Sequence, residues 1–319
     1  MKFLVIGATG CIGRAMVDFL IEKNADFRAV VHRTPLEKKV ETVYADITRP
    51  EDIEKCVRDV DVIFHLAFPM SHLTYSLPYK ELESLQCVAT ENIAKAACEA
   101  GVKRIVFMSS VSVYGKPRYF PIDENHPLQP SNNYALTKAD AERILLNYAD
   151  KIEVVLLRAA PVYGPGSQIF YKLLKMCKDG SMGVIGDGDK RTHLLYSRNC
   201  AQATYLAGTV KNINRQIFNV ADESPRTFNE IYSLIAEHLG IEKLRRLPYW
   251  KAYLYAAFSD FVSALTGHPA HFSRALLETL TRERIYSIEK AKKILGYKPA
   301  YTMEDGFAEM IEEFLKSEK

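Results

Sequence analysis

The sequence has few features of a disulfide-rich, metal-binding or nucleic-acid-binding protein. Its six cysteines include no Cys-x-x-Cys pair and no histidine partner at metal-ligand spacing, which argues against a disulfide scaffold and structural zinc. The eight histidines form neither His-x-x-x-His nor His-Glu-x-x-His, so we expect no metal. With 42 Lys and Arg against 39 acidic residues, the formal charge of +3 is too small to indicate nucleic-acid binding.

Long apolar runs are also missing. The amino terminus has only four apolar residues, Phe3 to Ile6, before a glycine turn, which is too short for the core of a signal peptide. The most aromatic stretch, 247–266, is too short and too charged to span a bilayer, so we expect no stable membrane insertion. These absences favour a protein of the reducing cytoplasm that acts on a small molecule.

Short β-branched runs alternate with segments of helical spacing through the first half of the 319-residue chain. Because the runs are apolar on both faces, they suit a parallel sheet that helices cover on both sides. We therefore predict a doubly wound α/β fold of the Rossmann type, with a dinucleotide-binding domain over residues 1–160. The predicted strands are Phe3–Ile6, Phe27–Val31, Val43–Tyr44, Val62–Leu66, Arg104–Met108 and Val154–Leu157.

The second half is richer in helical spacing and indicates a smaller, mostly helical substrate domain over residues 161–319. A strand near 215–221 could return to the main sheet. Within residues 247–266 we favour a helix whose apolar face packs on this domain, with a lid over an apolar substrate or a membrane-interface contact as alternatives. The residues of that face are Trp250, Tyr253, Leu254, Ala257, Phe258, Phe261, Val262 and Leu265.

A glycine-rich turn follows the first strand and opens the first helix. Its residues are Gly7-Ala-Thr-Gly10-Cys-Ile-Gly13. Glycines at this spacing allow a tight turn, close approach of the backbone to a pyrophosphate and close packing of helix on strand. The phosphates would then lie at the helix amino terminus and its free amides.

With these features in place, the chain resembles an extended short-chain dehydrogenase/reductase of the NAD-dependent epimerase/dehydratase family. In character it is most similar to 3β-hydroxysteroid dehydrogenase-like and dihydroflavonol reductase-like members. The resemblance covers essentially the whole chain. It rests on the glycine turn, His65-Leu66-Ala67, Ser110 in SSVSVYG, Tyr134 and Lys138 in YALTK, and Leu157-Arg158 leading to Tyr163-Gly164-Pro165.

The resemblance implies a nicotinamide cofactor, and the second strand bears on which one. NAD sites place an acidic residue about 20 residues beyond the glycines, whereas NADP sites provide a cation for the 2′-phosphate. Val31 occupies the acidic position here, and His32 and Arg33 follow it, so we expect NADP to be preferred over NAD. The cofactor contacts predicted are Gly7, Thr9, Gly10, Cys11, Ile12, Gly13, His32, Arg33, Asp46, Ile47, Leu66, Ala67, Tyr134, Lys138, Pro161 and Val162.

A Tyr-x-x-x-Lys pair provides the predicted proton-transfer group. Residues at i and i+4 share a helix face, so a lysine ammonium can lie beneath the phenol and favour phenolate. The pattern occurs three times, at Tyr134/Lys138, Tyr171/Lys175 and Tyr286/Lys290. Only the first follows a strand that ends in serines, so we predict that Tyr134 and Lys138 are catalytic and that the other pairs are solvated helix faces.

By resemblance, Ser110 is the catalytic serine, and its hydroxyl would hold the substrate oxygen beside Tyr134. Ser109 and Ser112 are neighbours that could do this instead. The family has an Asn where this chain has Gln86, so the water-positioning role of that Asn is left open here.

The substrate is indicated by departures from the sugar-nucleotide pattern. Pro161 replaces the Asn that contacts the nucleotide diphosphate in sugar-nucleotide members, whereas Arg191 matches a residue that can grip a diphosphate. We favour an oxidoreductase that interconverts a ketone and a secondary alcohol on an apolar or aromatic molecule, and the resemblance implies a homodimer. A nucleotide-sugar 4-epimerase or dehydratase with tightly bound NAD is the alternative, and a non-catalytic dinucleotide sensor a third. The predicted substrate residues are Phe68, Ser112, Tyr163 and Arg191.

Overall fold

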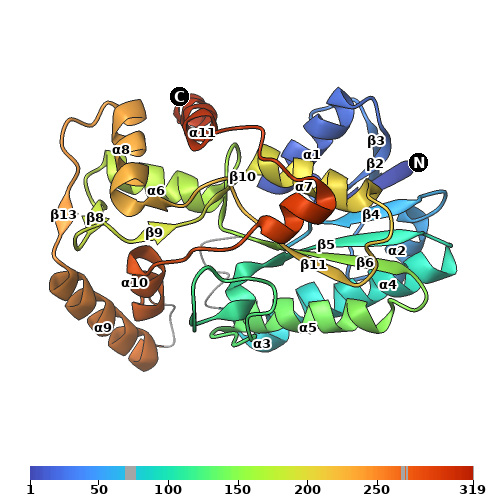
Figure 1. Ribbon diagram of the computed structural model, residues 1–319, viewed down its shortest axis with the longest axis horizontal. Coiled ribbons are helices and arrows are strands. Elements are labelled where there is room, and N and C mark those ends of the chain that lie inside the picture. Colours follow the sequence, from blue (N-terminus) through green and yellow to red (C-terminus); the bar gives the residue numbers. More distant parts are fainter. Residues whose placement is uncertain (69–76, 267–269, 271, 319) are drawn as a thin grey trace.

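Seven parallel strands form the main sheet of the protein, whose computed structural model describes residues 1–68, 77–266, 270 and 272–318 (Figure 1). The order across the sheet is β11-β6-β5-β4-β1-β2-β3, with the topological switch between β1 and β4. The prediction of a doubly wound sheet with a helical C-terminal region is confirmed. The strands are β1 (Lys2–Ile6), β2 (Asp26–Val31), β3 (Glu41–Tyr44), β4 (Val62–His65), β5 (Arg104–Ser110), β6 (Glu153–Ala159) and β11 (Gln216–Val220).

Helices cover both faces of this sheet (Figure 1). On one face α1 (Cys11–Glu22) and α7 (Ser197–Thr209) pack over β1, β4 and β5. On the other face lie α2 (Pro50–Cys56), α4 (Ala89–Glu99) and α5 (Asn133–Asn147). Because both faces are covered, the central strands are mostly apolar on both sides, and β4 is buried at all four positions. The shorter helices in this half are α3 (Tyr79–Glu83), the π-helical turn η2 (Ser84–Val88) and the 3₁₀ turn η3 (Val111–Tyr114).

A separate hydrophobic core holds the C-terminal region together. Its largest contributors are α6 (Gln168–Lys178), α8 (Phe228–Leu239) and α11 (Met303–Ser317). The remaining elements are β7 (Val162–Tyr163), β8 (Val184–Ile185), β9 (Arg191–Thr192), β10 (Leu195–Tyr196), β12 (Arg226–Thr227), β13 (Arg246–Leu247), α9 (Tyr249–Thr266), α10 (Arg274–Thr281) and η4 (Ala291–Leu295).

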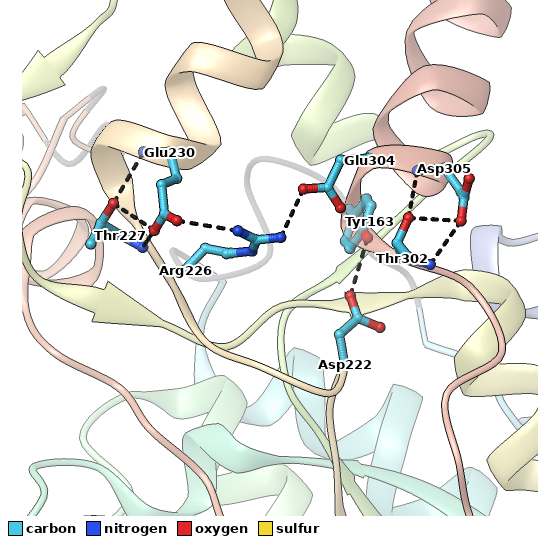
Figure 2. Close-up of polar contacts among 8 residues, drawn as sticks. All are labelled: Tyr163, Asp222, Arg226, Thr227, Glu230, Thr302, Glu304 and Asp305. Carbon is cyan, nitrogen blue, oxygen red and sulfur yellow. Dashed lines mark hydrogen bonds and ion pairs between the residues drawn. The ribbon is translucent and has the colours of Figure 1, made fainter.

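The amino termini of α8 and α11 are fixed by the same local device (Figure 2). In each helix a threonine side chain accepts from the third backbone amide, and an acidic side chain at that position accepts from the threonine backbone. Arg226 then joins the two termini, since its guanidinium donates to Glu230 at 3.2 Å and to Glu304 at 2.7 Å. The two helices are therefore held in a fixed relation at the rim of their shared core.

The aromatic helix α9 does not pack as the sequence predicts. A helix does form over 249–266, but its buried side chains are those of Ala252 and Ala256. The expectation that the aromatic face lies in the core is wrong, because a narrow alanine stripe makes the core contact instead. The exposed side chains include Trp250, Tyr253, Leu254, Tyr255, Phe258, Phe261, Val262 and Leu265. No helix within the described ranges is long and apolar enough to cross a membrane.

Candidate active site

The glycine turn joins β1 to α1, and its three glycines differ in what requires them. Gly7 has φ +92°, and a Cβ there would lie 2.7 Å from Ala67 Cα, while a Cβ on Gly13 would lie 2.0 Å from Gly7 O. The protein's own packing thus demands glycine at both positions. At Gly10, which is exposed, a Cβ would meet only Gly7 O at 3.6 Å. The smallness of Gly10 therefore serves an approach from outside, as a dinucleotide pyrophosphate would make.

The amino terminus of α1 fits an anion. The N-cap residue is Gly10, so no side chain caps the helix. The first turn contains no acidic residue. Free backbone amides and the positive end of the helix dipole therefore face outward at Cys11 and Ile12. Arg14 begins the next turn and its guanidinium donates to Thr9 O at 3.2 Å, which fixes the loop. These features fit the diphosphate of a dinucleotide.

The carboxyl end of β2 carries cations in place of a carboxylate. Val31, the last residue of the strand, is buried, whereas His32 and Arg33 are exposed. Arg33 makes no hydrogen bond or ion pair with any described residue. Asp46 Oδ1 accepts from the Thr48 hydroxyl at 2.7 Å and from the Thr48 backbone amide at 3.0 Å. These two bonds lower the pKa of Asp46. The His32 ring nitrogen Nε2 lies 3.8 Å from the other carboxylate oxygen of Asp46.

Residues after β4 lie on the other side of the glycine turn. Leu66 and Ala67 are partly exposed, and Ala67 is the residue that comes closest to Gly7. The Phe68 ring packs edge-on against Tyr134, with 5.0 Å between ring centroids. The predicted cofactor residues of β1 and β4 therefore meet at the switch point of the sheet, and Phe68 links them to α5.

Tyr134 and Lys138 lie one turn apart near the start of α5. Asn132 caps the helix, since its side chain accepts from the Ala135 amide at 2.9 Å. Lys138 is buried, and its Nζ donates to Met108 O at 2.8 Å and lies 4.9 Å from the centroid of the Phe68 ring. Burial lowers the pKa of Lys138 to about 7, against the opposing effect of the Glu142 carboxylate. The Lys138 amino group is thus held by the Met108 carbonyl with little solvation, one helical turn from Tyr134.

The three serines at the end of β5 and just after it differ in their hydrogen-bond partners. Ser109 is buried and donates to Glu142, so its hydroxyl points into the protein and not toward a substrate. Ser110 Oγ accepts from the Ser112 amide at 3.2 Å, which leaves its proton for another acceptor. Ser112 Oγ is buried and has no hydrogen-bond partner among the described residues. Of the two alternatives to Ser110, only Ser112 remains.

A buried polar network supports α5, and the sequence reasoning missed it. Arg158 on β6 donates to both oxygens of Glu142, at 3.0 and 2.6 Å, and to Tyr114 Oη at 3.1 Å. The Tyr114 hydroxyl in turn donates to Asn219 Oδ1 at 2.7 Å, which joins β11 to the network. Glu142 comes four residues after Lys138, so helical spacing could have placed it on the same face.

Gln86 lies in the π-helical turn η2 and is completely buried. Its Nε2 donates to Thr90 Oγ1 at 3.3 Å, and Thr90 Oγ1 lies 3.1 Å from His65 Nε2. Gln86 Oε1 and His65 Nδ1 are left without partners among the described residues. Burial lowers the pKa of His65 to about 3, so the ring is neutral at pH 7. Within the described ranges, no group of His, Cys, Asp or Glu side chains is placed to hold a metal ion.

The remaining predicted cofactor residues, Pro161 and Val162, and the predicted substrate residues Tyr163 and Arg191 follow β6. Pro161 and Val162 are partly exposed between β6 and the core, and Arg191 is exposed, 3.4 Å from Glu283. Tyr163 is fully enclosed and its hydroxyl donates to Asp222 at 3.1 Å (Figure 2). Protein surrounds both the ring and the hydroxyl of Tyr163, so this side chain has no surface free for a substrate.

The two other Tyr-x-x-x-Lys pairs are placed differently from the prediction. Tyr286 is buried, forms an isolated bridge with Ile122 and stacks with Tyr114, so this pair is not a solvated helix face. Tyr171 is on α6, as a helix-face residue should be, but its hydroxyl accepts from the Gly166 amide at 2.9 Å. The hydroxyl or ring of each of these two tyrosines has a partner within the fold, and the Tyr134 ring contacts Phe68, the residue after Ala67.

Comparison with known proteins decides the family. The sequence profile described as "NAD dependent epimerase/dehydratase family" matches residues 3–221. The chain belongs to this family. A relative assigned as UDP-glucose 4-epimerase in Methanocaldococcus jannaschii is 32% identical over 255 residues, which cover 74% of this chain and 82% of that protein.

Two further relatives of this epimerase/dehydratase family member align along nearly its full length. The decarboxylating sterol-4-alpha-carboxylate 3-dehydrogenase of Mus musculus is 25% identical and covers 98% of this chain and 91% of its own length. The solved structure of MoeE5 in complex with UDP-glucose and NAD has a TM-score of 0.80, 25% identity and complete coverage of both chains. The resemblance to extended short-chain dehydrogenase/reductases is confirmed, and the protein is an enzyme of that type. Since its relatives include both 4-epimerases and sterol dehydrogenases, the family alone leaves the substrate open.

Proposed function

We propose that this enzyme interconverts a ketone and a secondary alcohol on an apolar or aromatic small molecule by hydride transfer, with Ser110, Tyr134 and Lys138 as catalytic residues. The observation that carries the proposal is the environment of Lys138. A buried ammonium fixed by Met108 O, one helical turn from a tyrosine at the carboxyl edge of the sheet, is costly for folding and suited to stabilising phenolate. We further propose that residues 161–319 form the substrate side of the site.

Each side chain has a distinct task in this proposal. Tyr134 exchanges a proton with the substrate oxygen, and Lys138 stabilises the phenolate that results. Ser110 donates a hydrogen bond to the same oxygen, since its own acceptor position is taken by the Ser112 amide. A nicotinamide, when bound, accepts or gives the hydride at its C4. Phe68 and Phe107 lie on either side of the lysine and keep water from it.

We propose NADP as the preferred cofactor. Support comes from buried Val31 in the position of the ribose carboxylate, and from exposed Arg33, whose guanidinium has no described partner. Isothermal titration with NADPH and NADH tests this, and Arg33→Ala should weaken NADPH about tenfold, the loss of one charge-assisted contact, with NADH unchanged. Arg58→Ala, another exposed arginine, is the control and should change neither affinity. Equal affinities of the wild type for the two cofactors would contradict the preference.

A nucleotide-sugar 4-epimerase is the second candidate. The Methanocaldococcus relative is assigned as a UDP-glucose 4-epimerase, and the solved structure of MoeE5 contains UDP-glucose. The sterol dehydrogenase supports the first candidate, as does Pro161, which offers no side-chain donor for a diphosphate. The two candidate reactions differ in whether the cofactor undergoes a net change. We expect apolar ketones, such as steroid, flavonoid and long-chain keto compounds, to oxidise NADPH in equimolar amount. Interconversion of UDP-sugars without net cofactor change would show the epimerase instead.

A further inference from the structure

Helix α9 carries apolar residues around most of its circumference, yet the body of the protein covers only one stripe. Ala252 and Ala256 are fully buried, whereas the Trp250 side chain is 61% exposed and the Leu265 side chain 71% exposed. A helix that is apolar all round is normally buried on all sides. The uncovered side of α9 therefore forms an aromatic surface, which we define as Trp250, Tyr253, Leu254, Tyr255, Phe258, Phe261, Val262 and Leu265.

Helix α9, which carries this aromatic surface, lies apart from the main sheet. Figure 1 shows α9 at an outer corner of the C-terminal region, beside α10 and distant from α1 and α7. The alanine stripe packs into the core that α6, α8 and α11 share, so the opposite side of the helix points outward. Tyr249, Trp250, Tyr253 and Leu254 line a shallow, open hollow on it.

The stretch of sequence that contains and flanks α9 carries an excess of positive charge. The stretch 243–274 has a formal charge of +4, more than the +3 of the whole chain. Its one acid, Asp260, is paired with Arg274 at 2.7 Å. The Lys251 ammonium lies 5.4 Å from the Trp250 ring. The five cations of the stretch are Lys243, Arg245, Arg246, Lys251 and Arg274.

We propose that the aromatic surface of α9 docks on the surface of an anionic phospholipid bilayer, with the helix parallel to the membrane plane. Tyrosine and tryptophan are favoured at the level of the lipid headgroups, and phenylalanine and leucine reach the acyl boundary. The cations of the stretch 243–274 match the negative surface potential of anionic lipids. The same cations disfavour a second copy of the chain as the occupant, because two stretches of like charge would meet.

The chain contains its own reporter for this contact, because Trp250 is its only tryptophan. We expect its emission to shift to shorter wavelength with vesicles of phosphatidylcholine and phosphatidylglycerol, and to be quenched by brominated lipid. Vesicles of phosphatidylcholine alone should give a weaker effect. Co-sedimentation measures the partition coefficient without requiring turnover, so the result is independent of the proposed reaction.

Matched variants separate the apolar from the charged contribution. Phe258→Ser with Phe261→Ser should reduce the partition coefficient at least about tenfold, since two large apolar side chains are removed from the contact. Lys243→Gln with Lys251→Gln, read by co-sedimentation, should weaken binding to the anionic vesicles by about fivefold per cation. Ile294→Ser, an exposed apolar residue on η4, is the control and should bind as wild type.

Two results would overturn the proposal. One is an unchanged Trp250 emission and no co-sedimentation with anionic vesicles at physiological ionic strength. The other is a blue shift that grows with protein concentration in the absence of lipid, together with a dimer by analytical ultracentrifugation that Phe258→Ser and Phe261→Ser abolish. That second result would assign the surface to another copy of the chain.

Discussion

The start of α5 buries charged side chains, whereas α9 exposes aromatic ones. Lys138, Glu142 and Arg158 are each less than 5% exposed, and Phe258 on α9 is 64% exposed. Both arrangements reverse the usual distribution of polar and apolar residues. At α5 the reversal is compensated within the fold, because every one of these charges has a hydrogen-bond partner. At α9 no other segment of the described chain covers the exposed rings.

The two regions also differ in what their ion pairs contribute. The Glu142–Arg158 pair is bidentate and dry, so loss of one partner leaves a charge without solvent. The Asp260–Arg274 pair joins α9 to α10 at 2.7 Å but is open to water and to salt. Distance alone would rank them as equals, and burial separates them.

The largest effect is expected at Tyr134. Tyr134→Phe keeps the ring against Phe68 and removes only the hydroxyl, so we expect turnover to fall by about 10³-fold or more with cofactor affinity close to wild type. Steady-state kinetics and titration calorimetry measure the two quantities. Tyr171→Phe is the control, because its hydroxyl serves Gly166, and should retain turnover. Normal turnover in Tyr134→Phe would remove the proposed mechanism.

The next effect concerns the ion pairs. Glu142→Gln should lower the free energy of unfolding by about 3–5 kcal/mol, because Arg158 stays buried without a full counter-charge. Asp260→Asn should cost less than about 1 kcal/mol. Urea unfolding followed by circular dichroism compares them. Similar losses in the two variants would show that burial does not separate these pairs.

Two buried histidines predict a loss of stability in acid. Burial lowers the pKa of His65 to about 3 and of His193 to about 4, whereas the unfolded chain protonates histidine near 6.5. Their contribution is fully present above about pH 6.5 and is lost as the pH falls toward those values. Between pH 7 and 5 each should remove about 2 kcal/mol from the free energy of unfolding.

Comparison with a variant isolates this term. In His193→Gln the loss between pH 7 and 5 should be about 2 kcal/mol smaller than in wild type, as measured by urea unfolding at both values. Asp222 acts in the opposite sense, since burial raises its pKa to about 6 and the folded carboxyl gains a proton as the pH falls. That contribution is common to wild type and variant and cancels. If wild type and His193→Gln lose the same free energy of unfolding between pH 7 and 5, then His193 is already protonated in the folded protein at pH 5.

The smallest effect is expected on α9. Phe258→Ala should change the free energy of unfolding by no more than about 0.5 kcal/mol, because the side chain is already exposed. Ala256→Phe, on the buried stripe of the same helix, should cost about 1–3 kcal/mol through overpacking. Thermal unfolding distinguishes the two. A large loss in Phe258→Ala would return the aromatic surface to the core.

The parts of the structure that sequence predicts well are those set by neighbours in the chain. The glycine turn, the strand that ends at Ser110 and the Tyr134–Lys138 pair all depend on spacings of a few residues, and the structure has each of them. Their catalytic roles, the boundary near residue 160 and the dimer stay predictions.

Contacts between segments that are distant in the sequence could not be predicted from such short spacings. Helical spacing identifies an apolar face on α9 but not which element covers it, and two small alanines provided the contact instead. Tyr286 satisfies the Tyr-x-x-x-Lys pattern, yet a bridge to Ile122 buries it. Arg158 meets Glu142 only because β6 lies beside β5 and α5 packs against both.

The place of β11 in the sheet has a consequence for how the chain is made on the ribosome. β6 pairs with β5 on one side and with β11 on the other, and β11 is synthesised only after β7, α6, β8, β9, β10 and α7. Until Gln216–Val220 leaves the ribosomal tunnel, the apolar β6 presents an open edge to other nascent chains. A fragment that stops near residue 160 keeps that edge permanently and is expected to aggregate, so the nucleotide-binding half reaches its final form only after most of the protein has been translated.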